Sequence, residues 1–553
     1  MSKFGVSLLH RFTAPLSAAG LVAGALFWLA ALTPSLIPRN GLLQGAIAGL
    51  CFAVGYGLAA GVAQLWVWLG LPAPGTGPLH WLRRVAAVAA GVIVIAAAFF
   101  AGGWQNDVTK ALGLPSVPAG WPFVLLAVGV ALFIVLLMIG RFFGALRELY
   151  LLPMRRLLPM RAAILLASVL ALWSFWAIGN GVLLQALLRG LDSAYRTVDA
   201  VIPADEAPPK DPLKTGSAAS LLSWEELGRE GRRRVLAAPD AAQITGITGK
   251  PAAEPLRIYV GLNSARTPEE RAALALAEME RVGAFSRKLL VIATPTGTGW
   301  VDEAAMMPLE VMQGGDLASV SVQYSYLPSW LTLFVDPVYG EDTARAVFDA
   351  IYGHWRSLPK DSRPRLFLFG LSLGSLNSDL ASDAFALLGD PFEGAFWTGP
   401  PFASRTWPQV TATRQQGSPA WLPVARNNSV FRFFTAQDQS QLQQPGWGPV
   451  KVLYLQYPSD PITFFKTDMW RREPDWMKSP RGPDVSPALT WMPAISFIQL
   501  AFDLMTATTV PKGRGHVFAA KDYAAGWQAI TQPEGFGEAE MKKLEVWLDG
   551  LGL

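Results

Sequence analysis

Five long apolar stretches dominate the first 190 residues of the chain. They cover residues 15–37, 42–71, 85–103, 121–140 and 162–188, and none contains Asp, Glu, Lys or Arg. A helix needs about 20 such residues to cross a bilayer. A cleaved signal peptide would account for the first stretch alone, and four more follow it. The sequence therefore predicts an α-helical transmembrane bundle of about five spans within residues 1–195.

The basic residues between these stretches predict an orientation. With five spans, one side of the membrane holds nine Lys and Arg residues: Lys3, Arg11, Arg83, Arg84, Arg141, Arg147, Arg155, Arg156 and Arg161. The other side holds four: Arg39, Lys110, Arg189 and Arg196. Cytoplasmic loops carry the excess of positive charge. We therefore expect a cytoplasmic N-terminus and an extracytoplasmic second half, a result that depends on the span count.

The second half has a different composition. Residues 1–200 carry 13 Lys and Arg against 4 acidic residues, whereas residues 201–553 carry 33 against 38. The second part contains no basic run typical of nucleic-acid binding, so no nucleic-acid partner is expected. The single cysteine, Cys51, excludes an intrachain disulfide and a zinc cluster built on several thiolates. We expect no metal and no cofactor.

Residues 241–553 read as one α/β domain, joined to the bundle by a linker and domain entry over residues 196–240. Residues 203–216 contain four prolines and lack apolar periodicity. Short apolar runs then alternate with amphipathic segments, which favours a mainly parallel sheet. The predicted strands are 257–262, 288–294, 318–326, 365–371, 393–398 and 450–457, and the predicted helices are 269–282, 341–356, 375–388 and 539–548.

One motif in this domain carries chemistry. Gly370-Leu371-Ser372-Leu373-Gly374 follows the predicted strand 365–371 and precedes a helix. A serine in such a strand–turn–helix setting is held on a strained turn with its hydroxyl exposed, and the glycines leave room for the turn. The alternative is a glycine-rich helix start with a capping serine. The flanking elements favour Ser372 as a nucleophile.

A serine nucleophile needs a base, and the chain has four histidines. His10 and His80 flank the predicted spans, and His354 lies inside the amphipathic helix 341–356. His516 lies in a loop late in the chain, Gly513-Arg514-Gly515-His516-Val517-Phe518. By elimination and by position, the sequence favours His516 as the base. The alternative is a surface loop histidine.

The orienting acid should follow a late strand between the serine and the histidine. Asp460 directly follows the predicted strand 450–457, in the turn Pro458-Ser459-Asp460-Pro461. It would hold the imidazole tautomer and stabilise the imidazolium. Asp438, after the apolar run 430–434, is the rival candidate. Three further aspartates, Asp468, Asp475 and Asp484, lie in an apparent insertion.

Backbone N–H groups would form the oxyanion hole. Leu373 follows the nucleophile and is the first candidate donor. The second should come from the turn after the strand 288–294, which reads Pro295-Thr296-Gly297-Thr298-Gly299-Trp300. We nominate Gly297 and Thr298 there. No P-loop lysine follows these glycines, so a nucleotide site is not expected.

Several longer strings resemble a known family. They are residues 32–39 (Leu-Thr-Pro-Ser-Leu-Ile-Pro-Arg), 293–302, 322–330 and 370–374. Together they are similar to the bacterial membrane-bound α/β-hydrolases of the alpha/beta-hydrolase 9 type, over nearly the whole chain. The resemblance implies a hydrolase fold, a Ser-Asp-His triad and a bacterial plasma-membrane location. It implies no particular substrate.

A lid insertion is expected over the site. Residues 400–449 and 463–487 are rich in Trp, Pro and Gln and are assigned to the lid. Residues 488–510 are mostly apolar, but Pro493, Gln499 and Asp503 interrupt them. A sixth span there would place Ser372 and His516 on opposite sides of the membrane. The segment therefore reads as a cap or a buried helix, in contact with the bilayer interface.

Three functional classes follow from the sequence. The first is a membrane-anchored serine hydrolase that cleaves a lipid-like or acyl ester through an acyl-enzyme, as carboxylesterases and lipases do. The second is an acyltransferase with the same triad. The third is a non-catalytic scaffold or transport-associated module with a hydrolase-like domain. The expected partners are the lipid bilayer and an ester or acyl substrate, and the sequence predicts no oligomeric state.

Overall fold

The computed structural model describes residues 12–72, 75–335, 340–382 and 389–553. Its internal packing divides the chain into two compact units. The helical unit contains Met1–Gly190, Thr467–Met477 and Val485–Asp503, and the sheet unit contains Leu191–Lys466, Lys478–Asp484 and Leu504–Leu553. Two stretches assigned above to the lid or cap thus pack with the N-terminal helices. The domain limits 1–195, 196–240 and 241–553 remain a prediction.

Four helices of the helical unit are long and apolar enough to cross a membrane. They are Gly41–Trp68, Gly77–Ala111, Trp121–Met154 and Met160–Gly181. The helices of this part of the chain are α2 (Ala18–Ala31), α3 (Gly41–Trp68), α4 (Thr76–Ala111), α5 (Trp121–Met154) and α6 (Met160–Trp176), which continues through the π-helical η1 (Ala177–Leu184) into α7 (Gln185–Ala200). The predicted helical bundle is therefore present, with four helices among the described residues that are long and apolar enough to span a membrane.

The first predicted span, 15–37, is shorter in the structure than in the sequence pattern. Helix α2 has 14 residues, capped at its start by the Ser17 side chain. At 1.5 Å per residue it is about 21 Å long, less than the ~30 Å hydrocarbon core. It ends because Pro34 disfavours a helical conformation at Thr33. Hydropathy continues past this point, but the helix does not.

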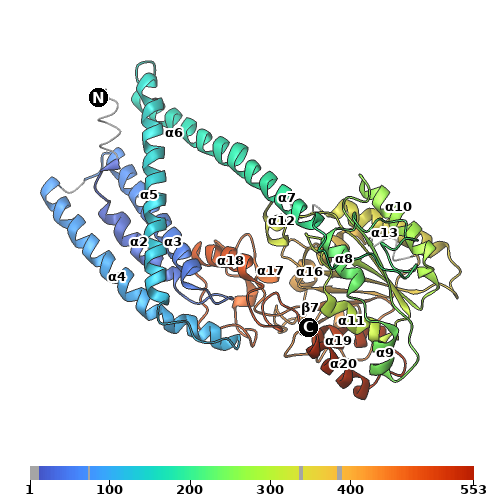
Figure 1. Ribbon diagram of the computed structural model, residues 1–553. Helices are drawn as coiled ribbons and strands as arrows, with labels where there is room; N and C mark the ends of the chain where they lie inside the picture. The colour runs from blue at the N-terminus through green and yellow to red at the C-terminus, as the bar shows by residue number, and fades with distance from the viewer. Residues whose placement is uncertain (1–11, 73–74, 336–339, 383–388) are drawn as a thin grey trace. The chain divides into compact units, whose positions relative to one another are not determined.

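Glycines set the close packing of α2, α3 and α5, which run side by side (Figure 1). A Cβ at Gly49 of α3 would lie 2.4 Å from the Gly129 carbonyl oxygen of α5. A Cβ at Gly129 would lie 2.3 Å from the Trp28 ring of α2. Small residues let backbones approach where lipid removes the hydrophobic drive for association.

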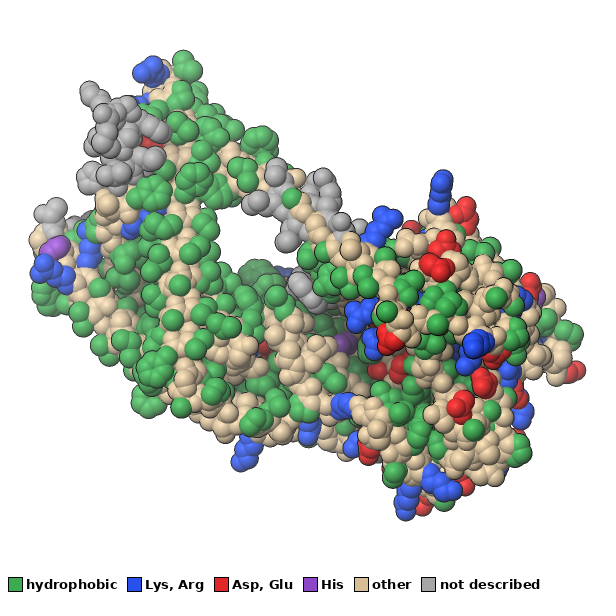
Figure 2. All heavy atoms as spheres, in the orientation of Figure 1, with side chains coloured by type: hydrophobic (Ala, Val, Ile, Leu, Met, Phe, Trp, Pro, Cys, Tyr) green, Lys and Arg blue, Asp and Glu red, His purple; other side chains and the backbone are tan. Residues whose placement is uncertain are grey.

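The outer faces of the long helices are apolar. Figure 2 shows hydrophobic side chains spread over them, while Lys, Arg, Asp and Glu gather on the sheet unit. The largest exposed apolar side chains include Val62 and Trp66 of α3, Val88 and Phe100 of α4, Phe123 and Val135 of α5, and Leu165 and Leu172 of α6. Such a surface is suited to lipid rather than to water.

The interior of the helical unit holds an ion pair. Arg39, at the entry to α3, contacts Asp503 at 2.9 Å, and neither side chain is exposed. Asp503 belongs to α18 (Ile495–Thr506), a 12-residue helix that begins in this unit. Ser35 donates its hydroxyl to the same carboxylate, and Gln499 donates to the Ala31 carbonyl oxygen at 3.1 Å. Within the segment 488–510, α18 is therefore a short helix and not a further long span; residues 488–503 belong to the helical unit and residues 504–510 to the sheet unit.

Among its described residues, the sheet unit contains seven strands: β1 (Leu256–Val260), β2 (Leu289–Thr294), β3 (Leu317–Val322), β4 (Arg365–Leu371), β5 (Gly394–Thr398), β6 (Phe431–Phe434) and β7 (Lys451–Leu455). Its described helices are α8 (Gly228–Leu236), α9 (Ala241–Thr248), α10 (Pro268–Arg281), α11 (Glu303–Met312), α12 (Ser329–Val335), α13 (Glu341–Ser357), α14 (Leu373–Ala381), α16 (Thr406–Ala412), α17 (Pro461–Phe464), α19 (Ala520–Thr531) and α20 (Glu538–Gly550). It also contains the short 3-10 turns η2 (Ala284–Ser286) and η3 (Arg426–Asn428). A further 3-10 turn, η4 (Asp475–Met477), belongs to the helical unit.

The strands form one sheet in the order β1-β3-β2-β4-β5-β7-β6, and every pairing is parallel. The predicted parallel sheet is confirmed. Helices α10 and α13 cover one face, and α11, α19 and α20 cover the other (Figure 1). The predicted helix 375–388 corresponds to α14, and residues 383–388 lie outside the described residues. Strand β6 falls inside the predicted lid and forms an edge of the sheet.

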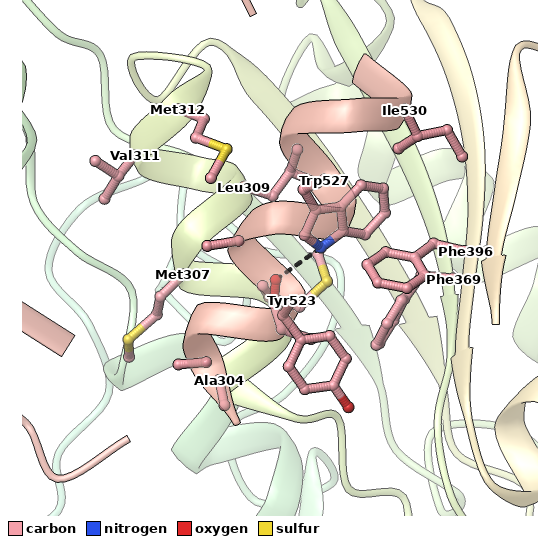
Figure 3. Packing of buried hydrophobic residues seen from close by; sticks show 14 of the residues in the cluster. Ala304, Met307, Leu309, Val311, Met312, Phe369, Phe396, Tyr523, Trp527 and Ile530 are labelled. Carbon is pink, nitrogen blue, oxygen red and sulfur yellow. Dashed lines mark hydrogen bonds between the residues drawn. The ribbon is translucent and has the colours of Figure 1, made fainter. Parts of the chain in front are cut away.

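A buried aromatic cluster packs α11 and α19 against the second face of the sheet. Trp527 of α19 is fully buried and donates its indole N–H to the Ala305 carbonyl oxygen of α11 at 2.9 Å (Figure 3). Its ring meets Phe369 of β4 and Phe396 of β5 edge-on or tilted, with centroids 5.0–5.8 Å apart. These contacts pack α19 against β4 and β5, and the candidate site lies at the carboxyl ends of such strands.

Candidate active site

Ser372 occupies a strained turn between β4 and α14. Its backbone angles are φ 56° and ψ −124°, a region that side chains rarely adopt. A Cβ at Gly370 would lie 2.4 Å from the Gly374 backbone, and a Cβ at Gly374 would lie 2.2 Å from the Thr294 carbonyl oxygen. Both motif glycines are thus required by close backbone approach. Backbone strain of this kind concentrates at functional sites.

Neighbouring elements hold the Ser372 backbone in place. Its N–H donates to the Thr398 carbonyl oxygen at the end of β5 at 2.9 Å. Its carbonyl oxygen accepts from the N–H and the hydroxyl of Ser375, at 2.9 and 2.7 Å. The side chain therefore lies at the first turn of α14, where free N–H groups and the helix dipole favour negative charge.

Asp460 and His516 are hydrogen-bonded to each other. Asp460 follows β7 and caps α17, with Oδ1 accepting from the Ile462 N–H at 2.8 Å. Its Oδ2 lies 2.7 Å from His516 Nδ1, and the carboxylate is fully buried. Thr463 donates a further bond to Oδ2 at 3.1 Å. A carboxylate at Nδ1 places the ring proton there and leaves Nε2 as the basic nitrogen.

His516 Nε2 is buried and has no hydrogen-bond partner within the described part of the chain. The ring lies against Gly399, because a Cβ at that position would be 2.6 Å from His516 Cε1. Gly399 directly follows Thr398, which accepts the Ser372 N–H. The strand end that holds the serine backbone therefore also supports the imidazole. A basic nitrogen without a hydrogen-bond partner among the described residues is free to accept a proton.

The alternative candidates for the base and the acid have other partners or lie in other elements. His354 of α13 pairs with Glu280 of α10 at 3.1 Å, and its ring packs against Phe285 at a tilt. Asp438 follows the edge strand β6, and its Oδ1 accepts from Ser440. His80 lies in α4 of the helical unit, and His10 falls outside the described residues. Among the described histidines, His516 has the buried aspartate partner.

The candidate oxyanion donors differ in their bonding. Leu373 begins α14, so its N–H has no acceptor within that helix. Thr298 lies inside a turn closed by the Gly299 N–H and the Thr296 carbonyl oxygen at 3.0 Å. The Gly297 N–H already donates to Ser329 Oγ at 3.1 Å. This bond makes Gly297 a poorer donor for a substrate oxygen than Leu373 or Thr298.

Burial alters the acid–base properties of nearby groups. Burial raises the pKa of Asp302, at the end of the turn 295–302, to about 7, although the Ala304 N–H bond opposes the shift. Burial also raises the pKa of Asp484 and of Asp522. Within the described residues, no three His, Cys, Asp or Glu side chains are grouped so as to hold a metal ion.

The sequence did not single out the residues that fasten the Asp460 and His516 loops together. Tyr457 donates its hydroxyl to Asp522 at 2.5 Å and accepts the Ala519 N–H at 3.1 Å. Its ring stacks on Phe518 with centroids 4.6 Å apart. Asp484, placed in an insertion by the sequence, contacts Ser459. The signal that could have found Ser459 is its place in the turn next to Asp460.

Comparison with known families gives two matches. A family model described as "Alpha/beta-hydrolase family" matches residues 256–544, more than half of the chain. The chain belongs to this alpha/beta-hydrolase family. A second model, "Alpha/beta-hydrolase family N-terminus", matches residues 32–239. The predicted family resemblance is confirmed over both parts of the chain. Comparisons with curated proteins and with solved structures gave no match.

Both family regions contain structural features described above. In this alpha/beta-hydrolase, the N-terminal match begins at Leu32, just after α2, and includes Arg39. The second match includes Ser372, Asp460, His516 and also Asp503. The two members of the buried ion pair in the helical unit therefore come from different family regions. Membership shows a hydrolase-like domain and the fold that the parallel sheet displays.

Proposed function

We propose that this alpha/beta-hydrolase is a membrane-anchored serine hydrolase that cleaves an ester through a Ser372–His516–Asp460 triad. The observation that carries the proposal is the 2.7 Å contact of Asp460 with His516 Nδ1, which leaves a buried, unpartnered Nε2 within the described residues. The strained turn at Ser372 supports it. A base oriented in this way activates a serine hydroxyl that is a poor nucleophile alone.

The reaction would proceed in two steps. His516 Nε2 takes the Ser372 proton as Oγ attacks the ester carbonyl, and the imidazolium then gives that proton to the departing alcohol oxygen. The N–H groups of Leu373 and Thr298 stabilise the oxyanion. In the second step His516 Nε2 takes a proton from water as the water oxygen attacks the acyl carbonyl, and then gives that proton to Ser372 Oγ as the bond to the acyl group breaks and the acid leaves. Asp460 holds the imidazole and stabilises its charged form throughout.

Labelling by a fluorophosphonate tests the nucleophile. We expect wild-type protein to be labelled and Ser372→Ala and His516→Ala to lose ester turnover by about 10⁴–10⁶-fold, the usual cost of removing such groups. His354→Ala, which alters a histidine paired with Glu280, is the matched control and keeps its activity. Substantial turnover by purified Ser372→Ala would disprove the triad. Product analysis separates free acid from an acyl group transferred to another alcohol.

We further propose that the sheet unit follows the fourth long helix out of the membrane on the extracytoplasmic side. The basic residues near the ends of the four long helices support this side, because Arg83, Arg84 and the five arginines of residues 141–161 lie on the opposite side from residues 191 onward. Whether the short α2 crosses the membrane changes the side of the N-terminus only. It therefore moves Lys3 and Arg11: with α2 as a span the two sides carry nine and four basic residues, and without it seven and six, so the charge bias is strongest with five spans.

Protease accessibility tests this orientation. The segment 203–214 is mostly exposed, so a protease added to intact spheroplasts should cut there. The expected product is a sheet-unit fragment that appears without lysis. Cleavage only after lysis would place the sheet unit, and its substrate, in the cytoplasm. A cytoplasmic protein of the same cells, intact before lysis and cut after it, is the control.

A further inference from the structure

A serine lies next to the proposed acid and bonds to the residue next to the proposed base. Ser459 precedes Asp460, and Gly515 precedes His516. Ser459 Oγ accepts the Gly515 N–H at 2.8 Å. This bond joins the two loops one residue away from the Asp460–His516 contact, so it fixes the spacing of the backbones that carry both side chains.

A buried carboxylate orients this serine. Ser459 donates its hydroxyl to Asp484 Oδ2 at 2.5 Å, and its N–H lies 3.3 Å from the same oxygen. Both residues are almost completely buried. A hydroxyl has one hydrogen to donate. Because Asp484 accepts that hydrogen, the lone pairs of Ser459 Oγ are left for the Gly515 N–H. A hydrogen bond from a hydroxyl to a carboxylate, such as the one from Ser459 to Asp484, is stronger than a bond between neutral groups.

The backbone around Asp484 is shaped for this contact. A Cβ at Gly482 would lie only 2.0 Å from Pro458 Cβ, so a glycine is needed for the segment 482–484 to reach the turn before Asp460. On the other side, Gly515 has φ +51° in the tight turn that Arg514 and Val517 close. Three chain segments distant in sequence therefore meet at Ser459.

We propose that Ser459 and Asp484 are positioning residues for the hydrolase reaction, with Asp484 acting through Ser459 to hold the His516 loop against Asp460. The inference rests on the proposed function. Neither residue belongs to the proposed triad. Asp484 fixes the direction of the Ser459 hydroxyl, Ser459 fixes Gly515, and the position of the His516 backbone follows.

Removal of the Ser459 hydroxyl is the first test. We expect Ser459→Ala to lower kcat about tenfold, as the loss of one buried hydrogen bond would, with KM within about twofold. Ser220→Ala is the matched control, because Ser220 also donates its hydroxyl to a buried carboxylate, Glu278, at 2.6 Å on α10. The control removes a similar bond elsewhere in the sheet unit and should leave kcat unchanged.

A double-mutant cycle tests the route through Ser459. Asp484→Ala should lower kcat about as much as Ser459→Ala, and the double variant should be no slower than either, since both remove one coupled unit. Asp484→Asn keeps an acceptor oxygen and should restore most of the rate. Multiplied losses of about a hundredfold in the double variant would show that Asp484 acts by another route and would overturn the inference.

Two outcomes separate this inference from the proposed function. If wild-type protein is labelled at Ser372 while Ser459→Ala and Ser220→Ala have the same kcat, the positioning role is wrong and the hydrolase proposal stands. If wild type shows neither labelling nor turnover, both are wrong. Should Ser459→Ala fail to fold, Ser459→Cys nearly keeps the volume with a weak donor and acceptor. Because the thiol keeps a weak form of both bonds, the deciding result is then Asp484→Ala, in which an unchanged kcat would overturn the role.

Discussion

The two units of this alpha/beta-hydrolase distribute polar and apolar side chains in opposite ways. The helical unit exposes large apolar side chains along its long helices, while Arg39, Gln44, Gln105 and Asp503 are buried. The sheet unit buries its aromatic core and carries charge on its surface (Figure 2). The apolar surface of the helical unit would suit lipid, and the charged surface of the sheet unit suits water. The two units also differ in how the buried arginines in their interiors are paired with carboxylates.

Buried arginines show this difference most directly. In the helical unit Arg39 pairs with one carboxylate, Asp503, and donates to the Gln44 side chain at 3.1 Å. In the sheet unit Arg257 contacts two carboxylates, Glu303 and Glu310, at 2.9 and 2.6 Å. Arg234 joins the same cluster through Glu303. The sheet unit thus groups two arginines with two carboxylates, whereas the ion pair described in the helical unit joins one arginine to one carboxylate.

The largest expected effect comes from breaking the Arg39–Asp503 pair. Arg39→Met should destabilise the helical unit by about 3–5 kcal/mol, because it leaves Asp503 as an uncompensated buried charge. Arg39→Met with Asp503→Leu removes both charges and should recover most of the loss. Unfolding in detergent, followed by tryptophan fluorescence, measures both variants. Equal losses in the single and the double variant would show that the ion pair is not what the helical unit depends on.

The next largest expected effect comes from Asp302, a buried aspartate of the sheet unit that lowers the stability of the protein as the pH rises. Asp302 caps α11 through the Ala304 N–H at 3.0 Å. Because its folded pKa is raised from 3.8 to about 7, its stabilising contribution is present below pH 3.8 and is lost as the pH rises through about 7. Between pH 5 and pH 7 the wild type should lose roughly 2 kcal/mol that Asp302→Asn does not lose.

The control for this prediction is built into the substitution, since asparagine caps helices about as well as aspartate. The measurement is the free energy of unfolding of the two proteins across this pH range. A wild-type and an Asp302→Asn curve that run parallel would contradict the assignment. The two buried aspartates therefore differ in their surroundings: Asp503 of the helical unit has the buried Arg39 beside it, whereas Asp302 of the sheet unit accepts a hydrogen bond at the N-terminus of α11.

The smallest effect concerns the glycine contacts of the helical unit. Gly49→Ala should cost about 1–2 kcal/mol, because the added methyl group meets the Gly129 carbonyl oxygen. Gly57 lies on the same helix with nothing within 4 Å of its Cβ position, so Gly57→Ala is the control and should be neutral or slightly stabilising. Unfolding in the same detergent measures both. Equal effects at the two positions would exclude close packing as the reason for Gly49.

Local patterns predicted much of the sheet unit. The predicted strand 365–371 coincides with β4, and β7 lies within the predicted strand 450–457. Buried parallel strands leave continuous apolar runs, and the motif glycines mark the turn after β4. These signals placed Ser372 and Asp460 at strand ends. The Asp460–His516 contact agrees with their expected arrangement, although the catalytic roles remain a prediction that activity must test.

What the sequence could not reveal depends on distant partners. Arg39 and Asp503 are 464 residues apart, and neither has a local pattern that indicates the other. Asp484 appeared to belong to an insertion, because nothing in its neighbours shows that Gly482 approaches Pro458. The short length of α2 was missed for a simpler reason. Hydropathy averages over Thr33, Pro34 and Ser35, whereas the helix ends there.

The Arg39–Asp503 pair also has a consequence for the order of synthesis. The ribosome makes Arg39 long before Asp503, so the first membrane helices form while the carboxylate partner does not yet exist. A chain that stops before residue 503 leaves a buried arginine without its counter-ion, a costly state. We therefore expect truncated chains to be recognised as misassembled and degraded. Completion of the last part of the protein would thus decide whether the first part persists.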